Sequence, residues 1–435
     1  MNVGYHTGKV TFKNRYKKYG SKNFKYYIYP SNVKINKISS TNNTISCNFK
    51  NCYIANNFYT LYISENYNFT NSKQYKFTIA KNISSYTKTI SNLKSGTKYY
   101  IKLIQTVKNN IIYYNSPYTI YSTITKTKVN KLTNNFYESY NSDLYASDFN
   151  NLVRLGNIKN FSNIILYLGK SSIPELKNLM FNNKVIFGCS TIVAHDKNNK
   201  YYYGRNFDWS NCNGLVLVNK TSDSLKSIST VNLDFFNTTT GPIKNKLTDS
   251  KLAQLAYFAP MDGMNESGIF VSILMLHEGN KINQNIKNKP HITETMAVRL
   301  ILNKAKTYND AIHILKKYNI HSAYNVHFAI SDKYGHSAVC EYVNNNLVIT
   351  KSKVVTNHYL TSKYKNKSNI SNSLNRYNTL NNISKSSINS YSDIISALNK
   401  TKNHTIWSIT YNPNNNQINY YFKENFNKCY SYSIK

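Results

Sequence analysis

Residues 187–209 read FGCSTIVAHDKNNKYYYGRNFDW, and two runs of strand-forming residues in this stretch flank the polar turn DKNNK. This pattern predicts a β-hairpin. The hairpin would bring Arg205 and Asp208 back beside Cys189, which follows a glycine near the start of the first run. An arginine near a thiol favours the thiolate, and an aspartate could hold and orient a cationic or amine partner. The stretch therefore predicts a reactive cysteine between charged neighbours.

Cutting the bond between Gly188 and Cys189 would give Cys189 a free α-amine. Such an amine has a pKa of about 7.7–8.0, which suits a general base at neutral pH, and it is covalently next to the thiol that must lose a proton. Gly188 has no Cβ and leaves room for the thiol to attack the preceding carbonyl in an N→S acyl shift. We therefore expect self-cleavage between Gly188 and Cys189, with no histidine needed as the base.

The residues that follow this hairpin predict an α+β architecture. Strands are expected at residues 214–219, 268–276, 326–331, 337–343, 406–411 and 417–422. Helices are expected at residues 293–306, where Met296, Leu300 and Ile301 share one face, and at residues 310–318. Helices packed outside antiparallel strands are the expected layering for this pattern.

Seven segments, in this order along residues 189–435, carry a resemblance to a known family: CSTI, YGRNFDW, MDGMNESGIFVSIL, HFAISDKYGHSAVCEY, VVTNHYL, LNRYNTL and TIWSITYNPNNNQINYYF. They resemble the choloylglycine hydrolase family of N-terminal-nucleophile enzymes, in the linear amide C–N hydrolase branch. This branch includes bile salt hydrolases, penicillin V acylases and acid-ceramidase-like amidases. The resemblance implies an αββα sandwich over residues 189–435 and hydrolysis of a non-peptide C–N bond, without a metal or cofactor.

The resemblance also implies roles for single residues. Cys189 matches the nucleophile, and Arg205 and Asp208 match its neighbours in the active site. Asn357, in VVTNHYL, matches the side chain that donates to the oxyanion. Arg376, in LNRYNTL, matches the last active-site arginine of the family.

Two further positions are implied with more departure from the family pattern. The second oxyanion donor of the family is a backbone N–H that falls on Met275, where many bile salt hydrolases have Asn; a backbone donor survives that change. Asn265 lies in the shared DGMNE turn and is a possible supporting residue or a turn former only. Bile salt hydrolases usually begin at the cysteine after an initiator Met, whereas 188 residues precede Cys189 here.

The residues before Cys189 predict three segments. Residues 1–30 resemble the tail of a small β repeat of gut bacterial surface proteins. Residues 31–128 alternate as an all-β sandwich and resemble a fibronectin type III domain, with Leu93 in the core, Gly96 in a turn and Tyr99 as the tyrosine-corner residue. The usual Trp is absent and Tyr59 or Tyr62 could replace it, so another seven-stranded sandwich stays open. Residues 129–188 contain two short amphipathic helices and form either a pro-segment or a retained α-chain.

The net charge of +36 is densest at the front of the chain. Residues 1–137 hold 21 Lys and Arg against one acid, Glu65, a net charge of +20. No Arg-rich run, zinc-finger spacing or aromatic RNA-binding signature accompanies this charge, so we expect no nucleic-acid partner. A solvated lysine face is one explanation; binding of an anionic cell-envelope polymer through residues 1–137 is the other.

The remaining features restrict the class of protein. Six cysteines without a CxxC pair predict neither a structural zinc site nor a disulfide scaffold. A membrane-spanning helix needs about 20 apolar residues, and every apolar stretch of this sequence is much shorter. The start of the chain lacks a signal-peptide pattern. By analogy with its front repeats, we expect an extracellular or cell-surface location.

Three functions remain open at this point. The first is hydrolysis of a small linear amide, whether a conjugated bile salt, penicillin V or an N-acyl amino acid or amine. The second is acyl transfer to an amine with the same site. The third is a cell-surface adhesion protein with a silent catalytic fold. Neither the substrate nor the oligomeric state follows from the sequence.

Overall fold

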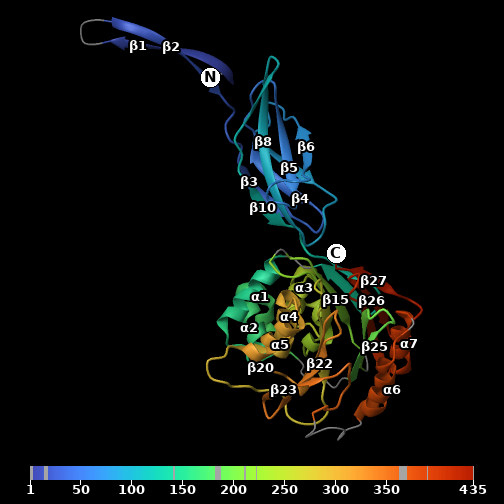
Figure 1. The fold of residues 1–435 in the computed structure, drawn as a ribbon. Helices are drawn as coiled ribbons and strands as arrows, with labels where there is room; N and C mark the ends of the chain where they lie inside the picture. Colours follow the sequence, from blue (N-terminus) through green and yellow to red (C-terminus); the bar gives the residue numbers. More distant parts are fainter. Residues whose placement is uncertain are drawn as a thin grey trace. The chain divides into compact units, whose positions relative to one another are not determined.

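The computed structural model describes residues 3–13, 18–140, 143–181, 188–209, 212–221, 223–361, 370–388 and 390–434. The chain divides into two compact units, Met1–Lys126 and Thr127–Lys435 (Figure 1). The first unit is built from strands, and the second combines helices and sheets. The first unit ends two residues before the boundary that the sequence predicts at residue 128.

The first unit begins with a hairpin of β1 (Gly4–Lys13) and β2 (Lys18–Ile28), which pair antiparallel. A sandwich of two sheets follows. One sheet has the order β3 (Ile35–Ser40), β4 (Ile45–Lys50), β7 (Ser85–Ile90). The other has the order β10 (Tyr121–Ile124), β8 (Lys98–Asn109), β5 (Asn57–Ser64), β6 (Lys73–Phe77), with β9 (Ile112–Asn115) paired to β8.

The core of this sandwich contains the residues expected there from the alternation over Tyr99 and from the resemblance, which places Leu93 in the core. Leu93 and Tyr99 are buried, and the backbone N–H of Lys94 donates to the Tyr99 hydroxyl at 3.0 Å. Tyr59 is fully buried and donates its hydroxyl hydrogen to Asn51 Oδ1 at 2.7 Å. Tyr59 is therefore a large ring of the sandwich core, whereas Tyr62 is half-buried.

The second unit contains two large sheets. Over the described residues, nine strands form the first sheet in the order β11 (Val129–Lys131), β12 (Phe136–Tyr140), β15 (Gly214–Asn219), β16 (Ser227–Asn232), β17 (Asp262–Asn265), β18 (Phe270–Met275), β21 (Val326–Ser331), β22 (Ser337–Val343), β23 (Asn346–Lys351). Six strands of the same described ranges form the second, in the order β24 (Val354–Val355), β13 (Gly188–His195), β14 (Tyr201–Asp208), β25 (Thr405–Asn412), β26 (Gln417–Phe422), β27 (Tyr430–Ser433). The short strands β19 (His291–Thr293) and β20 (Asn319–His321) pair in parallel.

Helices cover the outer faces of these two sheets. Helices α3 (Asp249–Tyr257), α4 (Glu294–Lys304) and α5 (Tyr308–Lys317) pack against the nine-stranded sheet, on the side where α1 (Asp143–Leu155) and α2 (Phe161–Ser171) also lie (Figure 1). Helices α6 (Ser373–Lys385) and α7 (Ser392–Lys400) pack against the six-stranded sheet. The layers are helix, sheet, sheet and helix, as the α+β pattern and the family resemblance predict.

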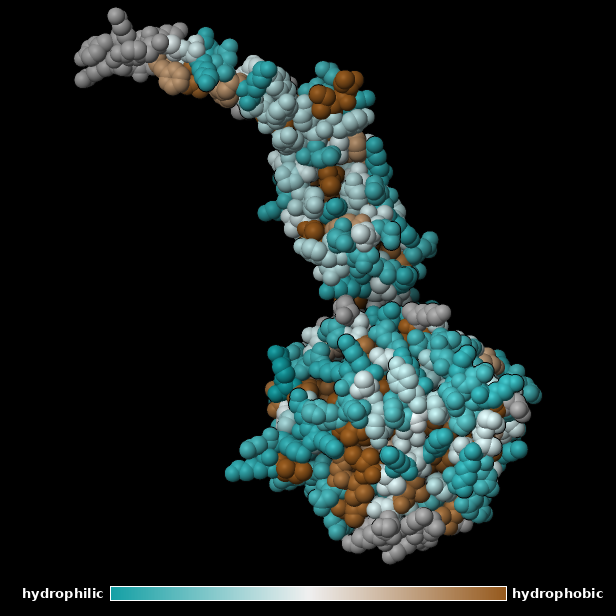
Figure 2. Space-filling view, viewed as in Figure 1, coloured by the Kyte–Doolittle hydropathy of each residue, from teal (hydrophilic) through white to brown (hydrophobic). Residues whose placement is uncertain are grey.

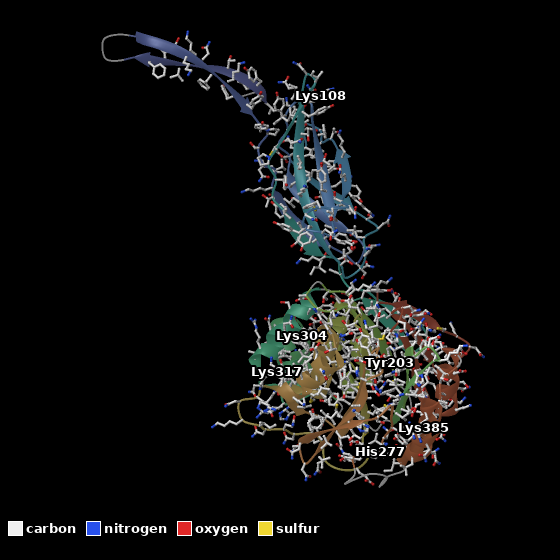
Figure 3. The ribbon with its side chains drawn as sticks, in the orientation of Figure 1. Lys108, Tyr203, His277, Lys304, Lys317 and Lys385 are labelled. Atoms are coloured by element: carbon white, nitrogen blue, oxygen red, sulfur yellow. The ribbon has the colours of Figure 1, made fainter. Side chains whose placement is uncertain are left out.

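Aromatic rings fill the space between the two sheets. Phe207 of β14 stacks on Trp407 of β25, with ring centroids 3.8 Å apart, and the Trp407 Nε1 donates across the interior to Asp262 of β17 at 3.2 Å. Tyr203, labelled in the middle of the second unit in Figure 3, is fully buried and stacks on Phe270 of β18. Alternation along β14 therefore directs Tyr203, Arg205 and Phe207 into the sandwich.

The segment ahead of Cys189 differs from the expectation of helices alone. Both expected helices are present as α1 and α2, but β11 and β12 also belong to the nine-stranded sheet, where β12 pairs in parallel with β15. The sequence did not reveal these strands because β11 pairs with β12, and β12 joins the sheet through β15, whose residues lie 78 positions later in the chain. Residues 182–187, which include the start of the predicted strand before Cys189, lie outside the described residues.

Two further features concern the polarity of the front unit's surface and the apolar character of the helices. The front unit presents mainly hydrophilic residues on the face drawn in Figure 2, with single hydrophobic side chains between them. Among the helices of the described ranges, none is long and apolar enough to cross a membrane.

Candidate active site

Cys189 lies at the start of β13, and the hairpin to β14 brings its predicted neighbours close. The register pairs Gly188 with Asp208 and Thr191 with Arg205. The strand–turn–strand prediction is therefore confirmed as geometry, while the catalytic roles of these residues stay predictions. Cys189 is fully buried.

Arg205 connects the thiol to the opposite sheet. Its Nη2 lies 3.5 Å from Cys189 Sγ and donates to the Ile273 carbonyl oxygen at 3.1 Å. Burial raises the pKa of the Cys189 thiol to about 12, although the positive charges of Arg205 and Arg376 oppose this shift. In this form the thiol is protonated at neutral pH, so that its reaction requires a base close to the sulfur.

Asp262 is a member of this cluster that the sequence analysis missed. Its Oδ2 lies 2.6 Å from Arg205 Nε, and both side chains are fully buried. The signal that could have revealed Asp262 is the MDGMNESG segment, in which it lies three positions before Asn265. Because Asp262 also accepts from Trp407, the carboxylate fixes the Arg205 guanidinium from a rigid part of the interior.

Arg376 of α6 joins three of the predicted residues. Its Nη1 donates to the Cys189 carbonyl oxygen at 2.6 Å and lies 3.2 Å from Asp208 Oδ2. Its Nη2 donates to Asn357 Oδ1 at 2.7 Å. Arg376 is 3% exposed, so it is a buried arginine and not part of the helix surface.

Asn357 contacts both ends of the reactive region. Its Oδ1 accepts from the backbone N–H of Cys189 at 2.7 Å, and its Nδ2 donates to the Met275 carbonyl oxygen at 2.8 Å. Leu276, the residue after Met275, donates its N–H to the Asn325 carbonyl oxygen at 2.9 Å, on the side of β18 that faces β21. By the alternation of a β-ladder, the backbone N–H of Met275 points to the other side of β18, where Asn357 lies. The two expected oxyanion donors, the Asn357 Nδ2 and the Met275 N–H, therefore lie on the same side of β18.

Asp208 lies on the face of β14 that is turned toward α6. Its Oδ1 accepts from Thr405 Oγ1 at 2.6 Å, a contact that the sequence analysis missed. Burial raises the pKa of Asp208 to about 6, with Arg376 acting in the opposite direction. A Cβ at position 188 would lie 3.2 Å from the Asp208 Cβ, so the glycine allows Asp208 to approach the bond before Cys189.

Asn265 lies apart from these contacts. Its Nδ2 donates to the carbonyl oxygens of Leu302 and Ala305 at the end of α4, and its Oδ1 accepts from Ser267 and Ile269 N–H groups. These four bonds hold the turn between β17 and β18 against the helix. The structure therefore gives Asn265 the turn-forming role that the sequence analysis left as one of two alternatives.

A cavity of about 490 Å³ lies against the helix-covered face of β17 and β18. Its apolar wall includes Met261, Ile273 and Val326, together with Phe161, whose ring stacks on Phe236 with centroids 5.0 Å apart. Ile273 is the residue whose carbonyl accepts from Arg205. Val326 pairs with Met275. None of Cys189, Arg205, Asp208, Asn357 and Arg376 lines the cavity, so it borders β18 and not the Cys189 cluster itself.

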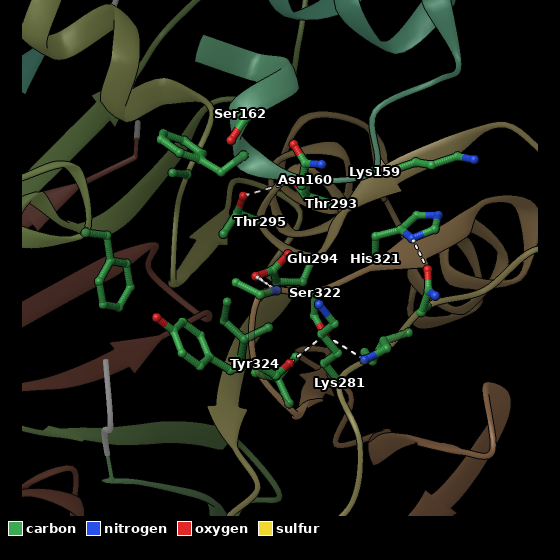
Figure 4. Close-up of a pocket in the computed structure, with 18 of the residues that line it drawn as sticks. Lys159, Asn160, Ser162, Lys281, Thr293, Glu294, Thr295, His321, Ser322 and Tyr324 are labelled. Carbon is green, nitrogen blue, oxygen red and sulfur yellow. Dashed lines mark hydrogen bonds between the residues drawn. The ribbon is translucent and has the colours of Figure 1, made fainter. Parts of the chain in front are cut away.

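The polar wall of this cavity contains charged groups (Figure 4). Glu294 lies in the middle of the view, half-buried, and accepts from the Ala323 N–H at 3.2 Å. Burial raises its pKa to about 7. The exposed residues Lys159 and Lys281 also line the cavity. In the described ranges, no group of three or more His, Cys, Asp or Glu side chains is arranged to hold a metal ion.

Solved structures of two enzymes are similar to this chain at low identity. Penicillin V acylase from Agrobacterium tumefaciens is 16% identical, and the match covers 54% of this chain and 83% of the acylase with a TM-score of 0.39. A mutant of conjugated bile acid hydrolase from Clostridium perfringens is 15% identical, with coverage of 56% and 92% and a TM-score of 0.41. No curated protein matches the chain.

A family model gives the assignment. The model of linear amide C–N hydrolases, choloylglycine hydrolase family, matches residues 189–423, which is more than half of the chain and begins at Cys189. The match spans every side chain of the cluster described above. The chain belongs to the linear amide C–N hydrolases of the choloylglycine hydrolase family.

Proposed function

We propose that this linear amide hydrolase uses Cys189 as an N-terminal nucleophile after the chain cuts itself between Gly188 and Cys189. One observation carries the proposal: Asn357 Oδ1 accepts from the Cys189 backbone nitrogen at 2.7 Å, beside a thiol 3.5 Å from Arg205. That nitrogen becomes the α-amine after cutting. It would be held in place by a bond that already exists in the uncut chain.

The cut proceeds as an acyl shift. Cys189 Sγ attacks the Gly188 carbonyl carbon and forms a thioester, the C–N bond between the two residues breaks, and the thiol proton passes to the released amine. Water then hydrolyses the thioester and leaves Gly188 with a carboxylate. The close approach of Asp208 to Gly188 places a carboxyl with a pKa of about 6 beside this bond.

Amide hydrolysis then follows with the same sulfur. The free amine takes the thiol proton, and Arg205 stabilises the thiolate that attacks the acyl carbon of the substrate. The Asn357 Nδ2 and the Met275 N–H bind the oxyanion, and one such donor lowers the barrier by about 3 kcal/mol. The amine protonates the leaving nitrogen, and water releases the acid.

We infer that the residues ahead of Cys189 stay bound after the cut, as a retained α-chain. Phe136 of β12 is fully buried and stacks on Phe422 with centroids 3.9 Å apart. Tyr145 of α1 donates to the Ser250 carbonyl oxygen at 2.6 Å. Phe161 lines the cavity, so loss of the front piece would also open a wall of this space.

The 490 Å³ cavity borders β18 on its helix-covered face, but none of Cys189, Arg205, Asp208, Asn357 and Arg376 lines it, so the cavity does not identify the substrate. The lining is mixed, with rings and aliphatic side chains beside Glu294 and the lysines. Conjugated bile salts, penicillin V and N-acyl amino acids or amines are the substrate classes to compare.

For the front unit we propose a fibronectin type III domain on a cell-surface protein, preceded by the end of a small β repeat. The two packed sheets, of three and five strands, and the bond that the Lys94 N–H donates to the Tyr99 hydroxyl support this assignment. The charge of +20 over residues 1–137 supports binding to an anionic envelope polymer.

Intact mass and product analysis of the purified full chain test the catalytic proposal. We expect a new N-terminus reading CSTIVAHD, a front piece that co-elutes with it, and hydrolysis of at least one of the three substrate classes. Cys189→Ala should stay at full length and be inactive. Full activity with Gly188 still joined to Cys189 would contradict the amine as base. An uncut, inactive chain would favour the adhesion protein, and amide products with added amine would favour an acyltransferase.

A further inference from the structure

The loop that carries Asn357 is buried although it has little regular structure. Residues 354–360 are all buried, and only Val354–Val355 pair as strand β24. Buried backbone N–H and C=O groups outside helices and sheets need other partners. The identity of these partners shows how Asn357 is held at Cys189.

Glu341 of β22 binds one end of this loop. Its Oε1 accepts from the Leu360 N–H at 2.7 Å, and its Oε2 accepts from the Thr361 N–H at 2.8 Å. The side chain is fully buried, and Oε1 also lies 3.3 Å from His327 Nδ1. A buried carboxylate that accepts two backbone N–H groups fixes the loop backbone strongly.

His327 of β21 binds the loop one residue before Asn357. Its Nε2 lies 2.8 Å from the Thr356 carbonyl oxygen. Because a carbonyl oxygen can only accept, Nε2 carries the hydrogen of this bond. His327 is fully buried between Glu341 and Thr356, and its Nδ1 lies 3.3 Å from Glu341 Oε1.

Ser373 binds Asn357 itself. Its Oγ accepts from the Asn357 N–H at 2.7 Å, and Thr356 Oγ1 donates to the Ser373 carbonyl oxygen at 3.1 Å. Ser373 is the first residue of α6, three positions before Arg376, which donates to Asn357 Oδ1. Backbone and side chain of Asn357 are thus both fixed to the same turn of one helix.

We propose that Glu341, His327 and Ser373 are positioning residues that hold Asn357 against Cys189 and the Met275 carbonyl. None of the three touches Cys189 through a contact of the described structure; they act through the loop backbone. The inference rests on the proposed function, since Asn357 is taken there as an oxyanion donor.

Two variants test the proposal in the full chain. Ser373→Ala removes the acceptor of the Asn357 N–H, and Glu341→Gln replaces one of two acceptor oxygens by a donor. We expect kcat to fall by about 10- to 100-fold with KM within about twofold, because a displacement of about 1 Å in a catalytic group has effects of this size. Ser408→Ala is the matched control: Ser408 is a fully buried serine that donates to Asn206 Oδ1 at 2.7 Å, outside this loop, and its kcat should stay near wild type.

A crystal structure of each variant separates this proposal from the proposed function. We expect Asn357 to leave its positions at Cys189 and Met275 in Ser373→Ala and Glu341→Gln, whether or not the wild type hydrolyses the amides tested. Unchanged Asn357 contacts, or a kcat loss in Ser408→Ala equal to that of Ser373→Ala, would overturn the proposal. If Glu341→Gln does not fold, Ser373→Ala decides alone.

Discussion

Arg205 is one of five arginines among 55 basic residues, the others being Arg15, Arg154, Arg299 and Arg376. Its guanidinium uses separate nitrogens for the Asp262 carboxylate and for the Ile273 carbonyl and Cys189 sulfur. An ammonium group has one nitrogen and cannot maintain this planar arrangement. At this position the geometry of the fork matters beyond its charge.

Arg205→Lys should therefore lose at least about tenfold in kcat/KM, since hydrogen bonds to charged groups are worth about 1.5–3 kcal/mol. The measurement is amide hydrolysis by the cut enzyme with the preferred substrate. Arg154→Lys is the matched control, because Arg154 is exposed on α1. Activity of Arg205→Lys within threefold of wild type, a limit of about 0.7 kcal/mol, would mean that charge alone suffices.

At the scale of elements, helix α4 begins with a residue in an unusual state. Thr293 caps the helix and Glu294 is its first residue, where the positive end of the helix dipole normally favours a carboxylate. Glu294 faces the cavity instead of open solvent, and burial outweighs the dipole by raising its pKa to about 7. The folded protein thus binds a proton there that the unfolded chain releases at about pH 4.3.

This difference predicts a pH-dependent effect of Glu294→Gln on stability. Between about pH 4 and pH 7 the folded state binds more protons than the unfolded state, so the wild type loses stability as pH rises through this window. Gln does not ionise, and the Tm of the variant relative to wild type should rise from pH 4 to pH 8. The change should be modest because the side chain is only half-buried. A Tm difference that is constant over this range would contradict the raised pKa.

At the scale of the whole molecule, the front unit has a charge imbalance. Glu65, the one acid of residues 1–137, already pairs with Lys94 at 2.8 Å. Several lysines of this unit lie over aromatic rings, such as Lys76, whose Nζ is 3.7 Å from the Phe58 ring centroid, and these rings carry no net negative charge. These cations are the feature that an anionic polymer would bind.

The full chain should therefore sediment together with cell walls that carry anionic polymers at low salt, and high salt should release it. Screening lengths fall from about 30 Å at 0.01 M to about 3 Å at 1 M ionic strength. Replacing Lys73, Lys76 and Lys81 together by Gln should weaken the binding and leave hydrolysis unchanged, since these residues lie outside the catalytic unit.

The matched control changes the same number of exposed lysines in the second unit. Lys304, Lys317 and Lys385, labelled in Figure 3, are each exposed and lie on three different helices. Their replacement by Gln should leave wall binding near wild type. Equal losses in both triple variants, or no binding of the wild type at low salt, would contradict a specific role of the front unit.

The sequence by itself determined the local part of this protein. The pairing of Arg205 and Asp208 with the start of β13 could be predicted because a hairpin encodes its register within twenty residues, through alternation and a polar turn. Strands β21, β22, β25 and β26 were predicted within two residues from their local pattern, and so were helices α4 and α5. Family motifs added Asn357 and Arg376, which no local pattern connects to Cys189.

Only the tertiary structure decided which distant groups complete the site. Asp262 reaches Arg205 across the gap between two sheets, Thr405 reaches Asp208 from a strand nearly 200 residues later, and Glu341 holds the Asn357 loop from another strand. The parallel pairing of β12 with β15 is of the same kind. Each contact depends on the order of strands in the sheets and on how the layers pack. These follow from the burial of apolar residues over the whole unit, which local sequence patterns do not encode.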